Sequence, residues 1–180
     1  MLLDIVALGR IIWLFIHYSY VELYQEKGFF RRRAPMAKIE ESVEIKQPAN
    51  KVFTYTTDAS TWSKWQSIIP TAEQTSQGPV KIGTTFKGTA RLQGLSMKWT
   101  GITTEYEPTA KYGKDITSAA MIIRQHNTYN PIGAGVKFTI KYDVTVRGLF
   151  KLCSPMLVGS LRKELKKSLG SLKNILETQS

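Results

Sequence analysis

The sequence predicts an α+β domain in which an antiparallel β-sheet is covered on one face by a long C-terminal helix. Between residues 71 and 148, segments rich in Thr, Val, Ile and aromatic residues are separated by turn sequences that contain Gly, Pro and Asn. From residue 149 to 177, apolar residues recur at three- and four-residue spacing, with basic residues on the other faces. A sheet with one solvated face therefore has one amphipathic helix to cover its other face.

Strict alternation identifies the first and last strands. In "KIEESVEIK", Ile39, Val43 and Ile45 alternate with charged or polar residues, which is typical of a strand with one solvated face. In "GVKFTIKYDVTVRG" the same alternation places six residues on one face: Val136, Phe138, Ile140, Tyr142, Val144 and Val146. These faces are expected to form the core.

Two short helices are predicted after the first strand. Pro48 suits the first turn of a helix that ends near residue 57. Asp58 or Ser60 can cap a second helix, on which Trp62 and Trp65 stand three residues apart and share a face.

The C-terminal helix is predicted over Leu149–Glu177. Its apolar face consists of Val158, Leu161, Leu165, Leu169, Leu172 and Leu176. Pro155 should fall within its first turns or separate it from a short preceding helix, because proline is excluded from helix interiors.

The 180-residue length suits one domain with an appendage, here residues 36–180 after an N-terminal extension of residues 1–35. A net charge of +11 favours acidic partners such as nucleic acid, anionic lipid or an acidic protein. The single cysteine, Cys153, excludes an intrachain disulfide and favours a reducing compartment, hence a cytoplasmic location.

The N-terminal extension is apolar from Leu2 to Tyr24 and is followed by three arginines, residues 31–33. Asp4 and Arg10 interrupt the apolar run, and an arginine near the centre of a spanning helix costs about 2.5–3.5 kcal/mol on insertion scales. Three interpretations remain. The extension is a mis-called start or added sequence upstream of Met36, a membrane or interfacial helix that makes the protein membrane-associated, or a helix docked on the domain.

Four segments together resemble the SRPBCC superfamily: "VFTYTTDASTWSKWQ", "GPVKIGTTF", "WTGITTEYEP" and "LRKELKKSLGSLKNILE". The likeness spans about Lys38 to Glu177 and is greatest to the polyketide cyclase/dehydrase-like branch, a relative of START and pollen-allergen proteins. It implies a helix-grip fold, with a curved antiparallel sheet of about six to seven strands around the C-terminal helix. It also implies a cavity for an apolar ligand between sheet and helix. Because this superfamily shares a shape and not a catalytic set, it does not specify chemistry.

Strand parity and this resemblance together give the candidate ligand-binding residues, with a plain core role as the alternative for each. Of the two short-helix tryptophans, Trp65 is expected to reach the cavity. The amides of Gln125 and Asn127 should either satisfy one another and a water or present hydrogen bonds to the polar end of a ligand. The full set is Trp65, Phe86, Met97, Trp99, Ile123, Gln125, Asn127, Phe138, Tyr142 and Met156.

Candidates for catalysis are few. Tyr142, His126 and Tyr106 are the residues that could act as an acid or base on a ligand, although parity places His126 on the solvated face. No H-x-x-x-H motif, cysteine cluster or closely spaced carboxylate set occurs, so neither a metal site nor a cofactor is expected.

Three functions are consistent with the sequence. The first is the binding, carriage or sensing of a hydrophobic small molecule or lipid, and the second is a polyketide cyclase/dehydratase-like activity. The third is a protein-interaction module with a filled core, whose partner, an acidic protein or an anionic membrane surface, contacts a basic patch formed by Arg162, Lys163, Lys166 and Lys167. Nucleic acid is disfavoured as a partner because no stacking motif of the RNA-recognition type and no helix-turn-helix spacing occurs.

Overall fold

Strands in which apolar and polar residues alternate, together with one leucine-rich helix, account for most of the domain, as the sequence predicts. The structure is a computed structural model and describes residues 36–178; the three interpretations of residues 1–35 lie outside that range. Its elements are β1 (Met36–Ile45), α2 (Ala49–Thr57), α3 (Ala59–Trp65), β2 (Thr71–Gln74), β3 (Thr85–Leu92), β4 (Leu95–Glu107), β5 (Lys111–Ser118), β6 (Met121–Ile132), β7 (Gly135–Val146), the 3-10 helix η1 (Gly148–Cys153) and α4 (Ser154–Thr178).

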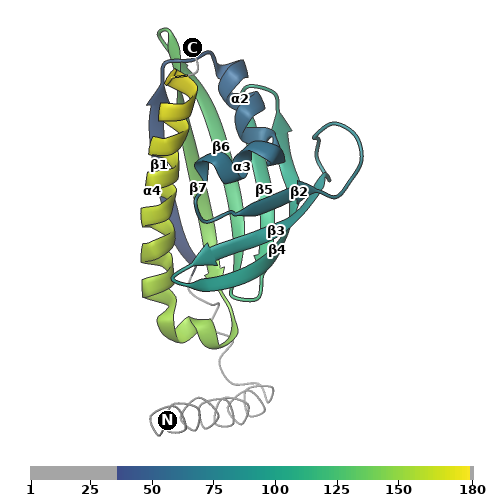
Figure 1. Cartoon of the computed structure of the whole chain (residues 1–180), viewed down its shortest axis with the longest axis vertical. Helices are drawn as coiled ribbons and strands as arrows, with labels where there is room; N and C mark the ends of the chain where they lie inside the picture. Colours follow the sequence, from purple (N-terminus) through teal and green to yellow (C-terminus); the bar gives the residue numbers. More distant parts are fainter. Residues whose placement is uncertain (1–35, 179–180) are drawn as a thin grey trace, which may run out of the picture. The chain divides into compact units, whose positions relative to one another are not determined.

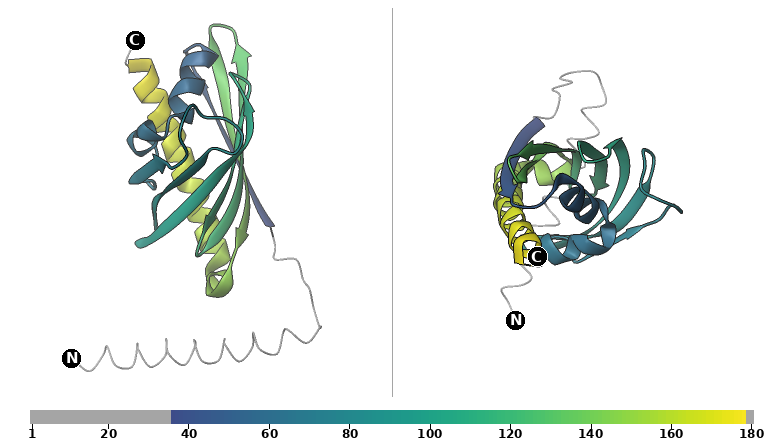
Figure 2. Two further views of the ribbon diagram at one scale, coloured as in Figure 1. Left: turned by 90° about the vertical axis from the view of Figure 1, so that its right-hand side faces the viewer. Right: turned by 90° about the horizontal axis from the view of Figure 1, so that it is seen from above.

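The seven strands form one antiparallel sheet in the order β1, β7, β6, β5, β4, β3, β2. Consecutive strands from β2 to β7 are neighbours, and β1 returns to pair with β7 along its whole length, from Met36 opposite Thr145 to Ile45 opposite Val136. The pairing of β4 with β5 shifts register between Thr103 and Glu105, a bulge of the kind that increases strand bending. The sheet curves around the helices on its concave side (Figures 1 and 2). This confirms the helix-grip fold.

The predicted strand faces are confirmed by burial. All six residues assigned to the inner face of β7 are buried, and on β1 Ile39 and Ile45 are buried while Val43 is half-buried. On β6 the side chains of Gln125 and Asn127 are buried, so their predicted parity is also correct.

The C-terminal helix begins five residues later than predicted. Residues 148–153 form the 3-10 helix η1, and α4 starts at Ser154 with Pro155 in its first turn. This boundary follows from proline itself, which has no N–H to donate within a helix but fits the first turn, where that N–H has no partner.

One face of α4 packs on the sheet. Its buried residues are Leu157, Leu161, Leu165, Ser168, Leu169, Leu172 and Leu176. Near its C-terminus, Glu177 accepts a hydrogen bond from the backbone N–H of Lys46 at 2.7 Å, and Lys173 donates to the Glu44 carbonyl at 2.8 Å. These bonds fasten the end of α4 to the end of β1. Within residues 36–178 no helix has the length and apolar composition needed to cross a bilayer.

The two short helices close one end of the sheet. The Asp58 carboxylate accepts a hydrogen bond from the Ser60 N–H at 2.9 Å, which confirms Asp58 as the cap of α3. Trp62 donates its indole N–H to the Thr56 carbonyl at 2.9 Å, and its ring lies 5.0 Å from that of Phe86. Trp62 thus joins α2, α3 and β3.

Truncating Leu172 to alanine (L172A) should lower the free energy of unfolding by about 2–5 kcal/mol, because it leaves a cavity at a fully buried site between α4 and the sheet. The same change at Leu152, which is 74% exposed, should have almost no effect. Urea denaturation of both variants measures this difference. Equal losses in the two variants would contradict the packing of α4 described above.

Candidate functional site

A cavity of about 70 Å³ lies between the inner face of the sheet, α3 and α4. Residues of five strands, α3, α4 and the loop between α3 and β2 line it: Trp62, Gln66, Ile68, Ile69, Ala90, Leu92, Met97, Trp99, Lys114, Ile116, Ser118, Met121, Ile123, Gln125, Tyr142 and Leu161. Most of these side chains are apolar. The volume is well below the roughly 300–1,000 Å³ of pockets that enclose a drug-sized ligand.

Trp99 forms part of the cavity wall because its cross-strand neighbour is a glycine. Gly88 of β3 lies opposite Trp99 of β4. A Cβ atom at Gly88 would overlap the Thr71 carbonyl oxygen and lie 2.7 Å from Cζ2 of the Trp99 ring. Any larger residue at position 88 would therefore require both the Thr71 backbone and the Trp99 ring to move.

Four polar side chains form a row across neighbouring strands on the inner face. Thr103 of β4 lies opposite Lys114 of β5. Gln125 of β6 lies opposite Lys114 on one side and opposite Tyr142 of β7 on the other. All four are buried, and Lys114, Gln125 and Tyr142 line the cavity. We call these three cavity-lining residues the polar row.

Lys114 is the unusual member of the polar row. Its side chain is only 5% exposed, and its Nζ lies 3.5 Å from the centroid of the Trp62 ring. Within residues 36–178, no carboxylate pairs with this amine and no side chain or carbonyl accepts a hydrogen bond from it. Burial lowers the pKa of Lys114 to about 7, because the charged form loses its hydration. The indole face offsets part of that loss through a cation–π contact.

The amide nitrogen of Gln125 has a hydrogen-bond acceptor within the protein. Its Nε2 donates to Oδ1 of Asn127 at 3.0 Å, one of the two alternatives that the sequence left open. Asn127 is buried behind the cavity wall, next to Tyr129, whose hydroxyl lies 2.7 Å from that of Thr56. Tyr142, the third residue of the polar row, has no hydrogen-bond partner within the described chain. Burial raises the pKa of its hydroxyl. Tyr142 is therefore protonated at neutral pH.

The side of the cavity at Ile68 and Leu92, which we call its mouth, lies beside contacts between α4 and two loops. Gln93, in the turn between β3 and β4, donates to the Ser160 hydroxyl at 2.5 Å, and Ser67 donates to Glu164 at 2.9 Å. Ile68 and Leu92 line both the cavity and a surface groove that also contains Arg91, Lys163 and Lys167. These two apolar side chains separate the cavity from a basic exterior. We call the surface groove that contains Arg91, Lys163 and Lys167 the basic rim.

Half of the predicted ligand-binding residues reach the cavity: Met97, Trp99, Ile123, Gln125 and Tyr142. Phe86, Asn127 and Phe138 are buried in the core beside it. Trp65 is buried too, but Trp62 is the tryptophan that lines the cavity, since it faces β3 and β4. Met156 is 55% exposed in the first turn of α4 and lies away from the cavity, because the buried face of the helix begins at Leu157.

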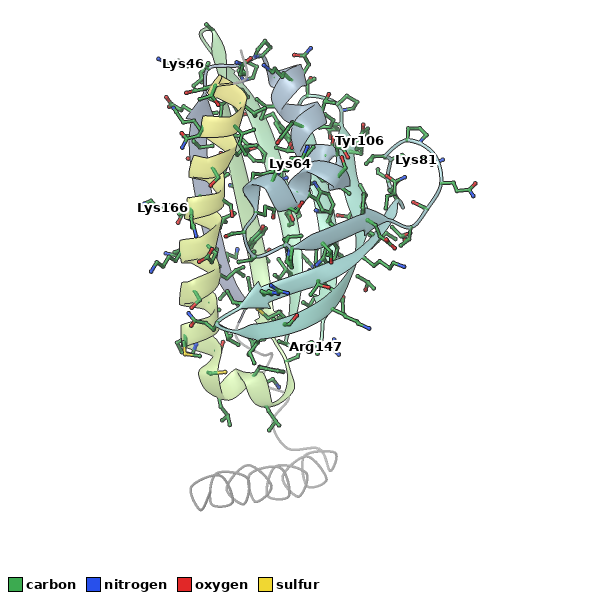
Figure 3. The ribbon with its side chains drawn as sticks, in the orientation of Figure 1. Lys46, Lys64, Lys81, Tyr106, Arg147 and Lys166 are labelled. Carbon is green, nitrogen blue, oxygen red and sulfur yellow. The ribbon has the colours of Figure 1, made fainter. Side chains whose placement is uncertain are left out.

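Two of the catalytic candidates lie elsewhere. His126 is on the outer face of the sheet, where its Nδ1 is 3.1 Å from Glu105 and both side chains are 40% exposed. Tyr106 packs edge-on against Phe53 and Tyr112 near α2 and does not line the cavity (Figure 3). Within residues 36–178 no cluster of His, Cys, Asp and Glu side chains has an arrangement suited to a metal ion.

Lys114 was not among the residues singled out from the sequence. The signal was present in "KYGKDITS", where Tyr112 and Ile116 alternate with polar residues and place Lys114 on their face. A lysine on the apolar face of a strand is rare, because burial of an unpaired amine is costly.

The sequence profile of the family described as "Polyketide cyclase / dehydrase and lipid transport" matches residues 36–177. The sequence matches no curated protein. Among solved structures, TTHA0849 from Thermus thermophilus is similar with a TM-score of 0.70 and 11% identity over 80% of this chain and 99% of that one. The Zhui aromatase/cyclase from Streptomyces gives 0.69 and 14% over 81% and 96%, and a START superfamily protein from Mycobacterium smegmatis gives 0.67 and 14% over 81% and 100%. At these identities the likeness concerns the fold alone.

Replacing Lys114 with methionine (K114M) should stabilise the protein most at low pH. At pH 6 the folded wild type holds a buried ammonium group, whereas K114M buries an apolar side chain of similar length. Between pH 7 and the ordinary lysine value of 10.5, the unfolded chain binds this proton and the folded chain does not, so wild-type stability rises with pH. The advantage of K114M should therefore shrink by about 1.4 kcal/mol per pH unit from pH 7 to 9.

Urea denaturation of the wild type and K114M at pH 6, 7, 8 and 9 measures this change. Lys163→Met, at an exposed position of α4, is the matched control and should differ from the wild type by the same amount at every pH. A pH-independent difference for K114M would mean that the amine is hydrated or paired.

Proposed function

Because the chain belongs to the polyketide cyclase/dehydrase and lipid transport family, we propose that it binds a hydrophobic small molecule or lipid between the sheet and α4 and acts as a carrier, sensor or sequestering protein. The observation that carries this proposal is the cavity itself. Its wall is mostly apolar and includes Trp62, Trp99 and Met97, side chains that bury large apolar areas. Three polar groups at one side, the polar row, suit the orientation of a ligand.

Binding requires the cavity to enlarge, since about 70 Å³ is too small for most such ligands. The mouth offers the means. The Gln93–Ser160 and Ser67–Glu164 hydrogen bonds join partly exposed side chains, which exchange partners with water at little cost. Their release would let the β3–β4 turn move away from α4, so that Leu92 and Ile68 no longer block entry.

A cyclase or dehydratase is the second candidate, and the position of Tyr142 favours it. Its side chain lines the cavity, and its hydroxyl keeps its proton at neutral pH, so it would serve as an acid or hydrogen-bond donor, not as a base. Loss of turnover in Tyr142→Phe with unchanged ligand binding would support this candidate. His126, on the outer face of the sheet, takes no part in it.

The small cavity is the observation that favours the third candidate, an interaction module with a filled core. Its partner would contact the basic patch of α4, whose four cationic residues are exposed; Lys166 points away from the sheet (Figure 3). An anionic membrane surface or an acidic protein matches this charge, and binding would weaken with added salt.

Ligand binding can be tested with the neutral apolar fluorophore N-phenyl-1-naphthylamine and the full-length chain. Ala90 lines the cavity, so its replacement by leucine (A90L) should fill the space and weaken binding of the fluorophore at least tenfold. Ala119→Leu, in the exposed turn between β5 and β6, should bind like the wild type. Fluorescence titration gives the three dissociation constants.

Equal binding by A90L and the wild type would place the fluorophore outside the cavity and contradict the proposal. Native mass spectrometry of the purified wild type, followed by organic extraction, is the complementary measurement. A co-purifying apolar species that A90L lacks would support a carrier. Complete absence of binding to either the fluorophore or extracted lipids would favour the interaction module.

A further inference from the structure

We propose that the polar row is a subsite for an acidic group, so that the preferred ligand is an apolar molecule with one carboxylate, which enters the cavity first and pairs with Lys114. This inference rests on the proposed function, because it specifies the ligand class of the same cavity. It predicts an orientation with the acid innermost and the apolar body towards the mouth.

The polar row includes hydrogen-bond donors that have no acceptor within the described residues. Lys114 offers N–H groups that have no acceptor within residues 36–178. The Tyr142 hydroxyl is free to donate as well. Among the described residues, no carboxylate lines the cavity. A ligand group that satisfies these donors must be an acceptor, and a carboxylate offers two oxygens with about four acceptor positions.

Within residues 36–178 the charge of Lys114 has no compensating group. Around its amine are the rings of Trp62, Phe86 and Tyr112, at 3.5, 5.9 and 5.4 Å, and among these only the Tyr112 phenol titrates. Tyr142 is the other titratable residue that lines the cavity. From α4 the cavity is lined by Leu161, which carries no charge. The acidic residues of the surrounding strands, Glu105, Asp115 and Asp143, alternate with inward residues and are exposed or half-exposed. A ligand anion would thus be the only counter-ion.

The position of Lys114 determines the orientation of the ligand. The mouth is at Ile68 and Leu92, which also border the basic rim, whereas Lys114 belongs to the central strand β5 and packs on Trp62. A carboxylate at Lys114 therefore leaves the apolar body against Met97, Leu92 and Ile68. The competing arrangement holds the acid outside, at Lys163 or Arg91 of the basic rim.

Ion pairing also couples binding to proton uptake. Burial keeps a large fraction of Lys114 neutral above pH 7 in the free protein. An adjacent carboxylate favours the charged form and raises this pKa. Binding at pH 8 should therefore take up a proton, whereas binding at pH 6, where the amine is already charged, should not.

The test compares octanoate with 1-octanol, which have the same chain length and differ in charge. Both compete with N-phenyl-1-naphthylamine for the full-length wild type, K114M and K163M at pH 7. We expect K114M to lose at least tenfold in octanoate affinity while its octanol affinity stays within about twofold. K163M should bind both ligands like the wild type.

The inference would be overturned if K114M bound octanoate as tightly as the wild type, or if K163M lost octanoate affinity instead. In either case, binding of octanol and the fluorophore to the wild type would still support the proposed function. If none of the three ligands binds to the wild type, both the inference and the proposed function fail.

Calorimetry on the wild type gives a result that does not depend on any variant. Octanoate titrations at pH 8 in two buffers of different ionisation enthalpy should show uptake of about one proton, and uptake near zero would contradict ion pairing with Lys114.

Discussion

The burial of the leucine face of α4 against the concave face of the sheet is the interaction on which the rest of the structure depends. The helix is held near β1 by bonds to Lys46 and Glu44, and near the β3–β4 turn by the bond between Ser160 and Gln93. These two attachments lie on opposite sides of the curved sheet. The helix therefore crosses the space inside the curve of the sheet without filling it. Trp62 enters this space from α3, and the cavity is what remains.

The Lys114 amine and the Trp99 indole N–H carry a stability cost that the proposed ligand binding would offset. A buried amine without a counter-ion and an indole N–H without an acceptor each lower the free energy of unfolding relative to apolar residues of the same size. A core designed only for stability would hold neither. Ligand sites are places where such groups are retained, since they are satisfied when the ligand arrives.

Most of the fold could be predicted from sequence because alternation and helical periodicity report directly on burial. The inner face of β7 and the leucine face of α4 follow from local patterns, which also narrowed the cap of α3 to Asp58 or Ser60. The site was predicted less completely. Trp62 and Trp65 share one helical face, and only packing against Phe86 and Trp99 decides which of them meets the cavity. Met156 is apolar and was therefore expected in the core. Pro155 sets the start of α4, however, and leaves Met156 outside the buried face of the helix.

The sequence by itself determined the element order and the strand faces, because each depends on residues close together in the chain, and it determined the family through the order and spacing of four segments. Only the tertiary structure decided that Lys114, Gln125 and Tyr142 stand side by side, since their alignment depends on the pairing register of β5, β6 and β7. It also decided that the amine of Lys114 faces the ring of Trp62, a residue 52 positions earlier on a different element. The physical reason is that periodicity specifies which face a side chain occupies, whereas its neighbours on that face are set by non-local pairing and packing.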